Sequence, residues 1–306
     1  MFRKVYKIKL METLSPAKLN LGLWILGKRK DGYHEIFTIF QAISLFDRIS
    51  IKEGPLRVET SNGIPQEENL VYKALRLMEH LLGRELEVQV FIEKNIPLGS
   101  GLGGGSSNVA TVLKAVNEML GNPLSFNQLL KIASKVSSDA PFFLYGGSAI
   151  GRGKGEIIEP IELPAFRFVV IYPEVQVSTK MIYSLVSSKE LTQNLDSDKI
   201  IDCLRKEEFE VLSNELGRLC AEVVPQVGEV LRFLESLGYK ALVSGSGSAV
   251  FFVGELEDRL KRACQLRGWR VYQVESLGCS STGRAPDFGS GGSWFESRHP
   301  SFSTKK

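Results

Sequence analysis

Residues 97–108 read PLGSGLGGGSSN, and this stretch says more about fold and function than any other segment of the 306-residue chain. Five glycines fall between Gly99 and Gly105, and residues 109–120, VATVLKAVNEML, follow with apolar residues at helical spacing. Glycine-rich backbone lets N–H groups approach an anion closely, although ordering it costs conformational entropy. The N-terminus of the following helix also attracts negative charge, and Ser106 and Ser107 are natural caps for it. The segment therefore predicts a loop that binds phosphate groups.

Three other interpretations of this loop are weaker. Flexible linkers are not usually flanked by a strand-like segment such as residues 87–94, EVQVFIEK, and an amphipathic helix. Gly99, Gly101 and Gly104 formally match the dinucleotide pattern G-x-G-x-x-G, but the acidic residue expected about 20 positions later would be near Glu118, inside the predicted helix. A Walker A loop needs a lysine before its terminal Ser or Thr, and this loop has none. The pattern indicates a phosphate loop of neither common kind.

The composition is that of an ordinary globular protein, with 43% apolar and 24% charged residues, and is long enough for two domains. A net charge of +3 is too small to favour a nucleic-acid partner. The sequence has no run of about 18 apolar residues and no signal-peptide core, so we expect no membrane association. The four cysteines show no C-x-x-C spacing, which favours a reduced cytoplasmic enzyme without a zinc site: Cys203, Cys220, Cys264 and Cys279.

The first half of the chain alternates between strand-like and helical patterns. Residues 12–58 read as strands, with Asp31-Gly32 between two apolar runs as a hairpin signal. Residues 69–82 have helical spacing and end at Gly83, and the strand 86–93, the glycine loop and a helix over 107–120 follow. A further helix opens at Pro123 and Ser125, and residues 137–156 look like a loop that enters a pair of strands.

The second half begins with a buried strand over residues 166–172, turns helical to about residue 237, and closes with strands in 242–254 and 269–276. This order of elements indicates an α+β protein with two lobes. We assign residues 12–160 to an N-terminal lobe that contains the glycine loop and residues 161–277 to a C-terminal lobe.

The two ends of the chain are set apart from these lobes. Residues 1–11 precede the first confident strand and are interpreted as a possible extension. Residues 278–306 change abruptly to Ser, Gly and Pro, and their GRAPDFGSGG and FESRHP segments resemble a translated transfer-RNA gene. We expect this tail to be disordered, so Cys279 and His299 have no predicted role in the chemistry.

Two charged residues could supply the chemistry that a phosphate loop lacks. Asp139 lies in SSDAPFF, where its alternative interpretation is a helix-terminal or turn aspartate. Lys18 is a lone lysine in the strand-like SPAKLNLGL, where its alternative is an edge or solvent residue. Phosphoryl transfer needs positioning, electrostatic stabilisation and one base, and this pair could provide them.

Four segments together resemble the GHMP kinases in order and spacing. They are residues 15–35, SPAKLNLGLWILGKRKDGYHE; 97–113, PLGSGLGGGSSNVATVL; 137–156, SSDAPFFLYGGSAIGRGKGE; and 242–252, LVSGSGSAVFF. The resemblance covers residues 12 to about 277. Within the superfamily it is nearest to kinases that act on a cytidine-diphosphate sugar alcohol in non-mevalonate isoprenoid synthesis. It implies a two-lobed α+β fold whose N-terminal lobe resembles a small-subunit ribosomal protein and whose C-terminal lobe is α/β.

The resemblance also implies roles for individual residues. Asp139 matches the catalytic base, and Lys18 matches the cation that pairs with it and stabilises the developing alkoxide. The residues that match the ATP site are Pro97, Leu98, Gly99, Ser100, Gly101, Leu102, Gly103, Gly104, Gly105, Ser106 and Ser107, with Asn69 and Lys94 near the adenine. The residues that match the acceptor site are Asn20 beside the acceptor, Tyr33 and His34 in the cytidine pocket, and Tyr183 as the second aromatic of a cytosine sandwich.

The expected small-molecule partners are ATP and the cytidine acceptor, with Mg²⁺ held by phosphates, serine hydroxyls and water rather than by a protein metal site. Two alternatives stay open. Another GHMP kinase, of the homoserine or mevalonate type, should lack the pairing of PAKLN with DGYHE. A non-catalytic nucleotide-binding protein should have lost Lys18 or Asp139, and both are present.

Overall fold

The computed structural model describes residues 10–278. The expectations for the terminal segments, residues 1–11 and 278–306, therefore fall almost entirely outside the described residues. The chain opens with a long antiparallel hairpin of β1 (Met11–Lys28) and β2 (His34–Glu53), paired from Met11 opposite Ile51 to Lys28 opposite His34. Gly32 in its turn has a φ of +87°, a conformation that favours glycine. The hairpin predicted at Asp31-Gly32 is therefore confirmed.

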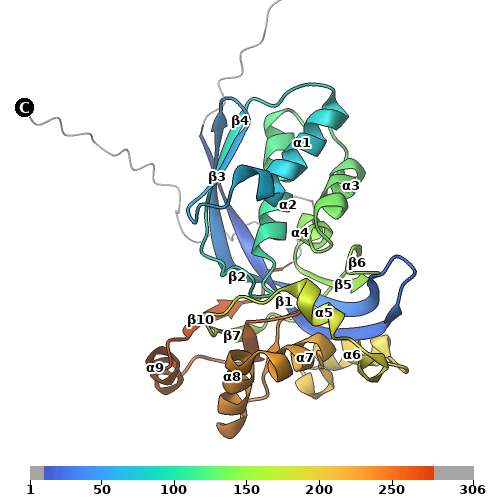
Figure 1. Ribbon diagram of the computed structural model, residues 1–306, viewed down its shortest axis with the longest axis vertical. Coiled ribbons are helices and arrows are strands. Elements are labelled where there is room, and N and C mark those ends of the chain that lie inside the picture. The colour runs from blue at the N-terminus through green and yellow to red at the C-terminus, as the bar shows by residue number, and fades with distance from the viewer. Residues whose placement is uncertain (1–9, 279–306) are drawn as a thin grey trace, which may run out of the picture.

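Strand β2 is the centre of the first sheet, whose order is β3-β4-β2-β5-β6 with β1 also paired to β2. The other strands are β3 (Arg57–Thr60), β4 (Val88–Glu93), β5 (Ser148–Arg152) and β6 (Ile157–Ile161). Four helices cover one face of this sheet (Figure 1): α1 (Leu70–Leu82), α2 (Gly104–Met119), α3 (Phe126–Val136) and α4 (Ala140–Tyr145). Their apolar faces and the sheet enclose one core cluster, in which Leu75, Met78 and Leu113 are buried.

The ends of these helices follow from local sequence, with one correction. Asn69 caps α1 through Val71 N–H, and Ser125 and Gln128 form a capping box on α3. Helix α2 begins at Gly104, three residues earlier than predicted, so Ser106 and Ser107 lie in its first turn and do not cap it. Its N-cap is Gly103, and within the described chain no side-chain cap hydrogen bond forms there. The first N–H groups of α2 therefore lack a side-chain cap.

The second lobe is a four-stranded sheet with the order β10-β7-β9-β8, which packs against helices on one side and against the β1–β2 hairpin on the other. Its strands are β7 (Arg167–Tyr172), β8 (Leu242–Val243), β9 (Val250–Val253) and β10 (Arg270–Glu275). Its helices are α5 (Thr179–Ser184), α6 (Ser197–Arg205), α7 (Glu215–Val223), α8 (Pro225–Ser236) and α9 (Asp258–Leu266). The α+β expectation is confirmed, whereas α9 was not predicted and α4 stands where the sequence suggested a loop.

The β1–β2 hairpin joins the two lobes, because its long strands extend from the first lobe along the second (Figure 1). Isolated bridges connect Leu23 with Asn214 and Ile25 with Leu191, and Leu277 N–H donates to Ala42 O at 2.8 Å. The predicted boundary near residue 160 falls at the end of β6. Within residues 10–278, no helix is both long and apolar enough to cross a membrane.

Candidate active site

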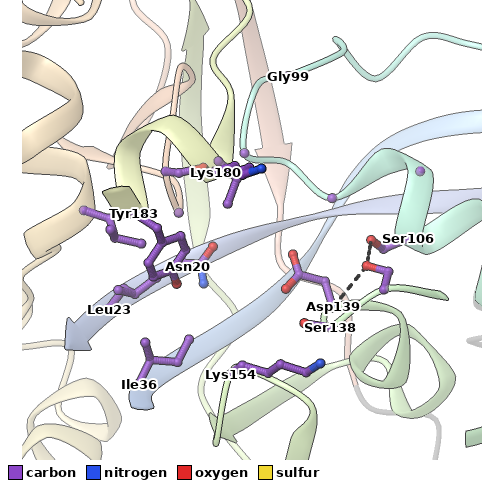
Figure 2. A pocket seen from close by; sticks show the side chains of 18 of the residues that line it. Asn20, Leu23, Ile36, Gly99, Ser106, Ser138, Asp139, Lys154, Lys180 and Tyr183 are labelled. Carbon is purple, nitrogen blue, oxygen red and sulfur yellow. Dashed lines mark hydrogen bonds between the residues drawn. The ribbon is translucent and has the colours of Figure 1, made fainter. Parts of the chain in front are cut away.

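A cavity of about 1150 Å³ lies between the two lobes and brings distant parts of the chain together. Its walls come from β1, the start of β2, the glycine loop, the turn before α4, helix α5 and the loop around Gly245 and Ser246. Figure 2 shows that Asn20, Asp139, Lys154 and Tyr183 enter this cavity from different elements. Residues that the sequence analysis had joined only by resemblance thus share one space.

The glycine loop is held by its carbonyl oxygens. Each carbonyl from residue 97 to 103 accepts a hydrogen bond, and that of Gly103 accepts the first one of α2. The donors are Ser100 Oγ to Pro97 O (2.6 Å), Tyr172 Oη to Leu98 O (3.4 Å), Val177 N to Gly99 O (2.9 Å), Ala249 N to Ser100 O (2.9 Å), Ser244 Oγ to Gly101 O (3.1 Å), Lys18 N to Leu102 O (3.0 Å) and Ser107 N to Gly103 O (2.9 Å). Because these carbonyls are fixed, the loop's backbone is organised before any ligand arrives.

Three glycines of the loop, Gly99, Gly101 and Gly103, have a positive φ and little room for a side chain. Gly101 and Gly103 have φ values of +77° and +73°. A Cβ on Gly101 would lie 2.1 Å from Ser244 O, and a Cβ on Gly103 would lie 3.0 Å from Lys18 Cγ and from Phe143 Cζ. The glycines therefore allow close packing against the second lobe and the lysine, in addition to open backbone for an anion.

Lys18 and Asp139 form an ion pair at the floor of the cavity. Lys18 Nζ is 3.6 Å from Asp139 Oδ2, and the lysine side chain is 4% exposed against 34% for the aspartate. Lys18 Nζ also donates to Asn20 Oδ1, and Asn20 Nδ2 donates to Thr38 Oγ1 at 2.7 Å. The side chain of Lys18 is therefore buried, and its contacts with Asp139 and Asn20 fix its direction. This excludes the interpretation of Lys18 as an edge-strand or solvent-exposed residue.

Burial lowers the pKa of Lys18 from its ordinary value, and the Coulombic attraction and hydrogen bond of Asp139 partly oppose that shift. Burial therefore destabilises the charged form of this ammonium group, and pairing with Asp139 stabilises it. A cation in such a place can stabilise negative charge that develops beside it.

Asp139 stands at the N-cap position of α4, but within the described chain its side chain makes no cap hydrogen bond. Its carboxylate faces Lys18, while its own N–H donates weakly to Ser137 Oγ at 3.4 Å. The helix-terminal aspartate considered from the sequence is thus present, yet its carboxylate remains available in the cavity.

Aromatic residues line the other end of the cavity. The ring of His34 stacks on that of Tyr183, with centroids 5.4 Å apart and planes inclined by 21°. Tyr33 is 54% exposed, and Lys154 Nζ lies 4.5 Å from its ring centroid. Burial and, secondarily, Asp139 raise the pKa of the Tyr183 hydroxyl, while burial and then Lys28 lower the pKa of His34. Neutral rings at this end suit stacking and hydrogen bonding with a planar base.

Some predicted site residues occupy supporting positions. Asn69 caps α1, and its neighbour Leu70 lines the cavity instead. Lys94 reaches the cavity, but its Nζ pairs with the buried Asp47 and donates to Asn108 Oδ1 at 2.9 Å. Leu102 is fully buried, and Ser107 Oγ is 2.7 Å from Ser15 Oγ. These residues hold the loop and the helix in place around the cavity.

The sequence patterns did not single out three lysines that also line the cavity. Lys28, Lys154 and Lys180 all line the cavity. Lys154 lies in the Gly-Lys-Gly of residues 153–155, whose glycines have positive φ and make a tight turn. That local pattern could have signalled a lysine presented on a turn, whereas Lys28 and Lys180 have no distinguishing sequence context.

Comparisons with known proteins find similarity along most of the chain. Family models described as GHMP kinases N terminal domain and GHMP kinases C terminal match residues 69–147 and 200–266. The chain is 49% identical over 266 residues to a 4-diphosphocytidyl-2-C-methyl-D-erythritol kinase from Persephonella marina, covering 85% of this chain and 97% of that relative.

Solved structures give the same picture. A crystal structure of 4-(cytidine 5'-diphospho)-2C-methyl-D-erythritol kinase matches with a TM-score of 0.76 at 35% identity, covering 87% of this chain and 99% of that one. A homoserine kinase from Cytophaga hutchinsonii matches with a TM-score of 0.65 at 18% identity, covering 91% and 97%, and so shares the fold.

Proposed function

The chain belongs to the GHMP kinases and, within them, to the 4-diphosphocytidyl-2-C-methyl-D-erythritol kinase family. From this premise we propose that it transfers the γ-phosphoryl group of ATP to the 2-hydroxyl of 4-diphosphocytidyl-2-C-methyl-D-erythritol. The products are the 2-phosphate and ADP, in non-mevalonate isoprenoid precursor synthesis. The observation that carries the proposal is the Lys18–Asp139 pair, 3.6 Å apart in the same cavity as the glycine loop.

The donor half of the proposal rests on the glycine loop. ATP phosphates lie along residues 97–107, where the carbonyls are already engaged and the first N–H groups of α2 lack a side-chain cap. The adenine lies toward Leu70 and Lys94, which line that part of the cavity. Preorganised backbone donors of this kind stabilise transferred phosphate charge without reorganising during the reaction.

At the junction, Asp139 accepts the proton of the acceptor hydroxyl. The hydroxyl oxygen forms its bond to the γ-phosphorus while the bond from that phosphorus to the bridging oxygen of ADP breaks. Lys18, oriented by Asn20, stabilises the negative charge that grows on the acceptor oxygen.

The site offers few protein ligands for the Mg²⁺ that accompanies ATP. Among residues 10–278, no group of three or more His, Cys, Asp or Glu side chains is arranged to hold a metal. One carboxylate, Asp139, and the hydroxyls of Ser106 and Ser137, 2.7 Å apart, line the cavity and would be the protein groups that help to hold magnesium bound to the ATP phosphates. The ion would neutralise phosphate charge.

The acceptor half rests on Tyr33, His34 and Tyr183. The cytosine ring stacks on the aromatic faces, and the His34 ring or backbone reads its edge. Lys154 and Lys180 supply positive charge for the diphosphate. We also place the enzyme in a reducing cytoplasm, which suits the free thiols of Cys203, Cys220 and Cys264.

The test offers three acceptors side by side with Mg-ATP: the cytidine compound, mevalonate and homoserine. We expect ADP release and a new phosphate monoester, followed by phosphorus NMR, with the cytidine compound alone. Turnover of mevalonate or homoserine in its place would refute the proposed acceptor and leave the broader kinase assignment.

A further inference from the structure

We propose that Glu35 is a positioning residue for the acceptor. It fastens the hairpin tip that carries Tyr33 and His34 to the turn of residues 152–156 that carries Lys154. The proposal rests on the function proposed above, because it assigns those two segments to the acceptor. Glu35 itself is absent from the cavity wall among the described residues, so it acts through its neighbours.

On the hairpin side, Glu35 closes a small network. Arg29 Nη1 donates to Glu35 Oε2 at 2.8 Å, and Arg29 Nε donates to Asp31 Oδ2 at 3.2 Å. Arg29 N–H also donates to Tyr33 O at 2.8 Å across the turn. The guanidinium is therefore held between two carboxylates, and the backbone that presents Tyr33 is tied to it.

On the other side, the second oxygen of Glu35 reaches a different segment. Gly153 N–H donates to Glu35 Oε1 at 3.0 Å, and Ile36 N–H donates to Gly153 O at 2.7 Å. Pairing between β2 and β5 ends at Thr38 opposite Gly151, so these two bonds extend the attachment beyond the sheet. One carboxylate thus bridges two segments more than 100 residues apart in the chain.

The bridged turn is itself rigid and lies between the aromatic end and the proposed base. Gly155 N–H donates to Arg152 O at 3.0 Å, and Lys154 N–H donates to Glu156 Oε2 at 2.7 Å. A Cβ on Gly155 would lie 3.8 Å from Asp139 Oδ1, while Lys154 Nζ lies 4.5 Å from the Tyr33 ring. Lys154 and Asp139 both project into the cavity in Figure 2. A shift of this turn therefore changes the distance between stacking ring, cation and base.

The contacts of Glu35 are expected to matter more for positioning the acceptor than for the stability of the fold. The Glu35 side chain is 40% exposed, and ion pairs at such sites contribute little to the free energy of unfolding. The hydrogen bond from Gly153 to a carboxylate is charge-assisted and directional, and small displacements of substrate-positioning groups strongly affect catalysis. Loss of Glu35 should therefore alter acceptor binding more than folding.

The experiment compares Glu35→Ala and Glu35→Gln with the wild type by steady-state kinetics and thermal melting. Glu35→Ala should raise KM for the cytidine compound about tenfold, the loss expected for one charged hydrogen bond, and leave KM for ATP within about twofold. Glu35→Gln keeps an oxygen for Gly153 N–H and should recover part of the loss. Glu59→Ala is the matched control, because it removes an exposed ion pair with Arg57 within β3, outside both the hairpin tip and the turn of residues 152–156.

A second arm tests whether Glu35 acts through the turn. In a Lys154→Met background, Glu35→Ala should raise the acceptor KM by a smaller factor than in the wild type, because the group being positioned has been removed. Full additivity, equal losses for ATP and acceptor, or an unchanged acceptor KM in Glu35→Ala would each overturn the inference. Wild-type enzyme that does not turn over the cytidine compound would instead overturn the proposed function and this inference with it.

Discussion

The two halves of the cavity are built in different ways. On the donor side, the loop of residues 97–103 is held by hydrogen bonds to its carbonyls, and its partners include the buried Ser244 and Ala249. On the acceptor side, the surfaces are side chains, among them the exposed Tyr33 and the half-buried Tyr183. The donor half is a backbone structure, and the acceptor half is an assembly of side chains.

This difference sets what each half can tolerate. A site built from backbone groups requires glycine wherever the chain packs closely or takes a positive φ. Such a site can therefore be recognised in the sequence by its glycines. A side-chain site can be built from many segments and is adjusted by exchanging residues.

Asp139 lies where the two halves meet, and changing it should give the largest effect. Asp139→Asn keeps the shape of the side chain but cannot accept the proton. We expect kcat to fall about 10²–10⁴-fold, the usual contribution of a general base, with ATP binding almost unchanged. The measurements are kcat with the cytidine compound and the dissociation constant of ATP by calorimetry.

A variant that kept more than half of the activity would make Asp139 a structural turn residue. Asp202→Asn offers a matched control, since it removes an exposed carboxylate that pairs with Arg205 on α6 and is not among the described residues that line the cavity.

Gly103→Val tests the backbone half. Valine rarely adopts a φ of +73°, and its Cβ would press on Lys18 and on Phe143. Backbone strain of this kind costs about 1–3 kcal/mol, which corresponds to roughly a 5- to 150-fold weakening of ATP binding. Because Lys18 is displaced as well, kcat should also fall, whereas binding of the cytidine compound should be nearly preserved.

The comparison variant for Gly103→Val is Gly63→Val, since a Cβ on Gly63, which also has positive φ, meets nothing within 4 Å. Equal losses of both ligands in Gly103→Val, with a lowered melting temperature, would show general misfolding and leave the separation of the two halves unsupported.

The same difference explains what the sequence could predict. The hairpin at Asp31-Gly32, helix α1 and the glycine loop between β4 and α2 followed from local signals, because turn glycines, caps and apolar spacing act over a few residues. Local signals misplaced the start of α2, because Gly104 and Gly105 are poor helix formers that tertiary packing holds in the helix.

The acceptor site could not be derived from local patterns. Lys18 and Asp139 are 121 positions apart, and only the folded sheet and α4 bring them together. Their interpretation depended on resemblance to a family, as did that of Tyr33 and Tyr183. The contact of Glu35 with Gly153 left no sequence signal, because a backbone N–H that donates to a distant carboxylate can belong to any residue except proline.

Tyr33→Ala tests the side-chain half. Stacking of a base on an aromatic ring is worth about 1–3 kcal/mol by alanine substitution, so KM for the cytidine compound should rise roughly 5- to 150-fold. KM for ATP should stay nearly constant, because Tyr33 lies on the hairpin away from the glycine loop. Tyr33→Phe retains the ring and should behave like the wild type. A loss of ATP affinity with unchanged acceptor KM would place Tyr33 in the donor pocket.

The pH dependence of kcat tests the buried cation at the junction. Burial lowers the pKa of Lys18, so the charged form needed for catalysis is lost as the pH rises toward that lowered value, below the range of an ordinary lysine. We expect kcat to be level near neutrality and to fall about tenfold per pH unit above the lowered pKa. Lys18→Arg, which stays charged, should have a lower plateau without this alkaline fall. An unchanged fall in Lys18→Arg would assign the titration to another group; Tyr183 is a poor candidate, because its pKa is raised.

Ser244→Ala should give the smallest effect, and its size follows from how the donor loop is held. The hydroxyl of Ser244 donates to Gly101 O at 3.1 Å and accepts from Asn20 N–H at 3.3 Å, both long bonds. The adjacent anchors from Ala249 N–H and Lys18 N–H remain, so the loop loses one support among several. A net loss of about 0.5–1.5 kcal/mol predicts a roughly two- to twelvefold rise in KM for ATP, with KM for the cytidine compound unchanged.

Ser148→Ala is the control, because that buried hydroxyl donates to Gln41 Oε1 within the first lobe. A larger loss than that of Gly103→Val would mean that a single side chain, rather than the set of backbone contacts, organises the phosphate loop, and the contrast between the two halves would then fail.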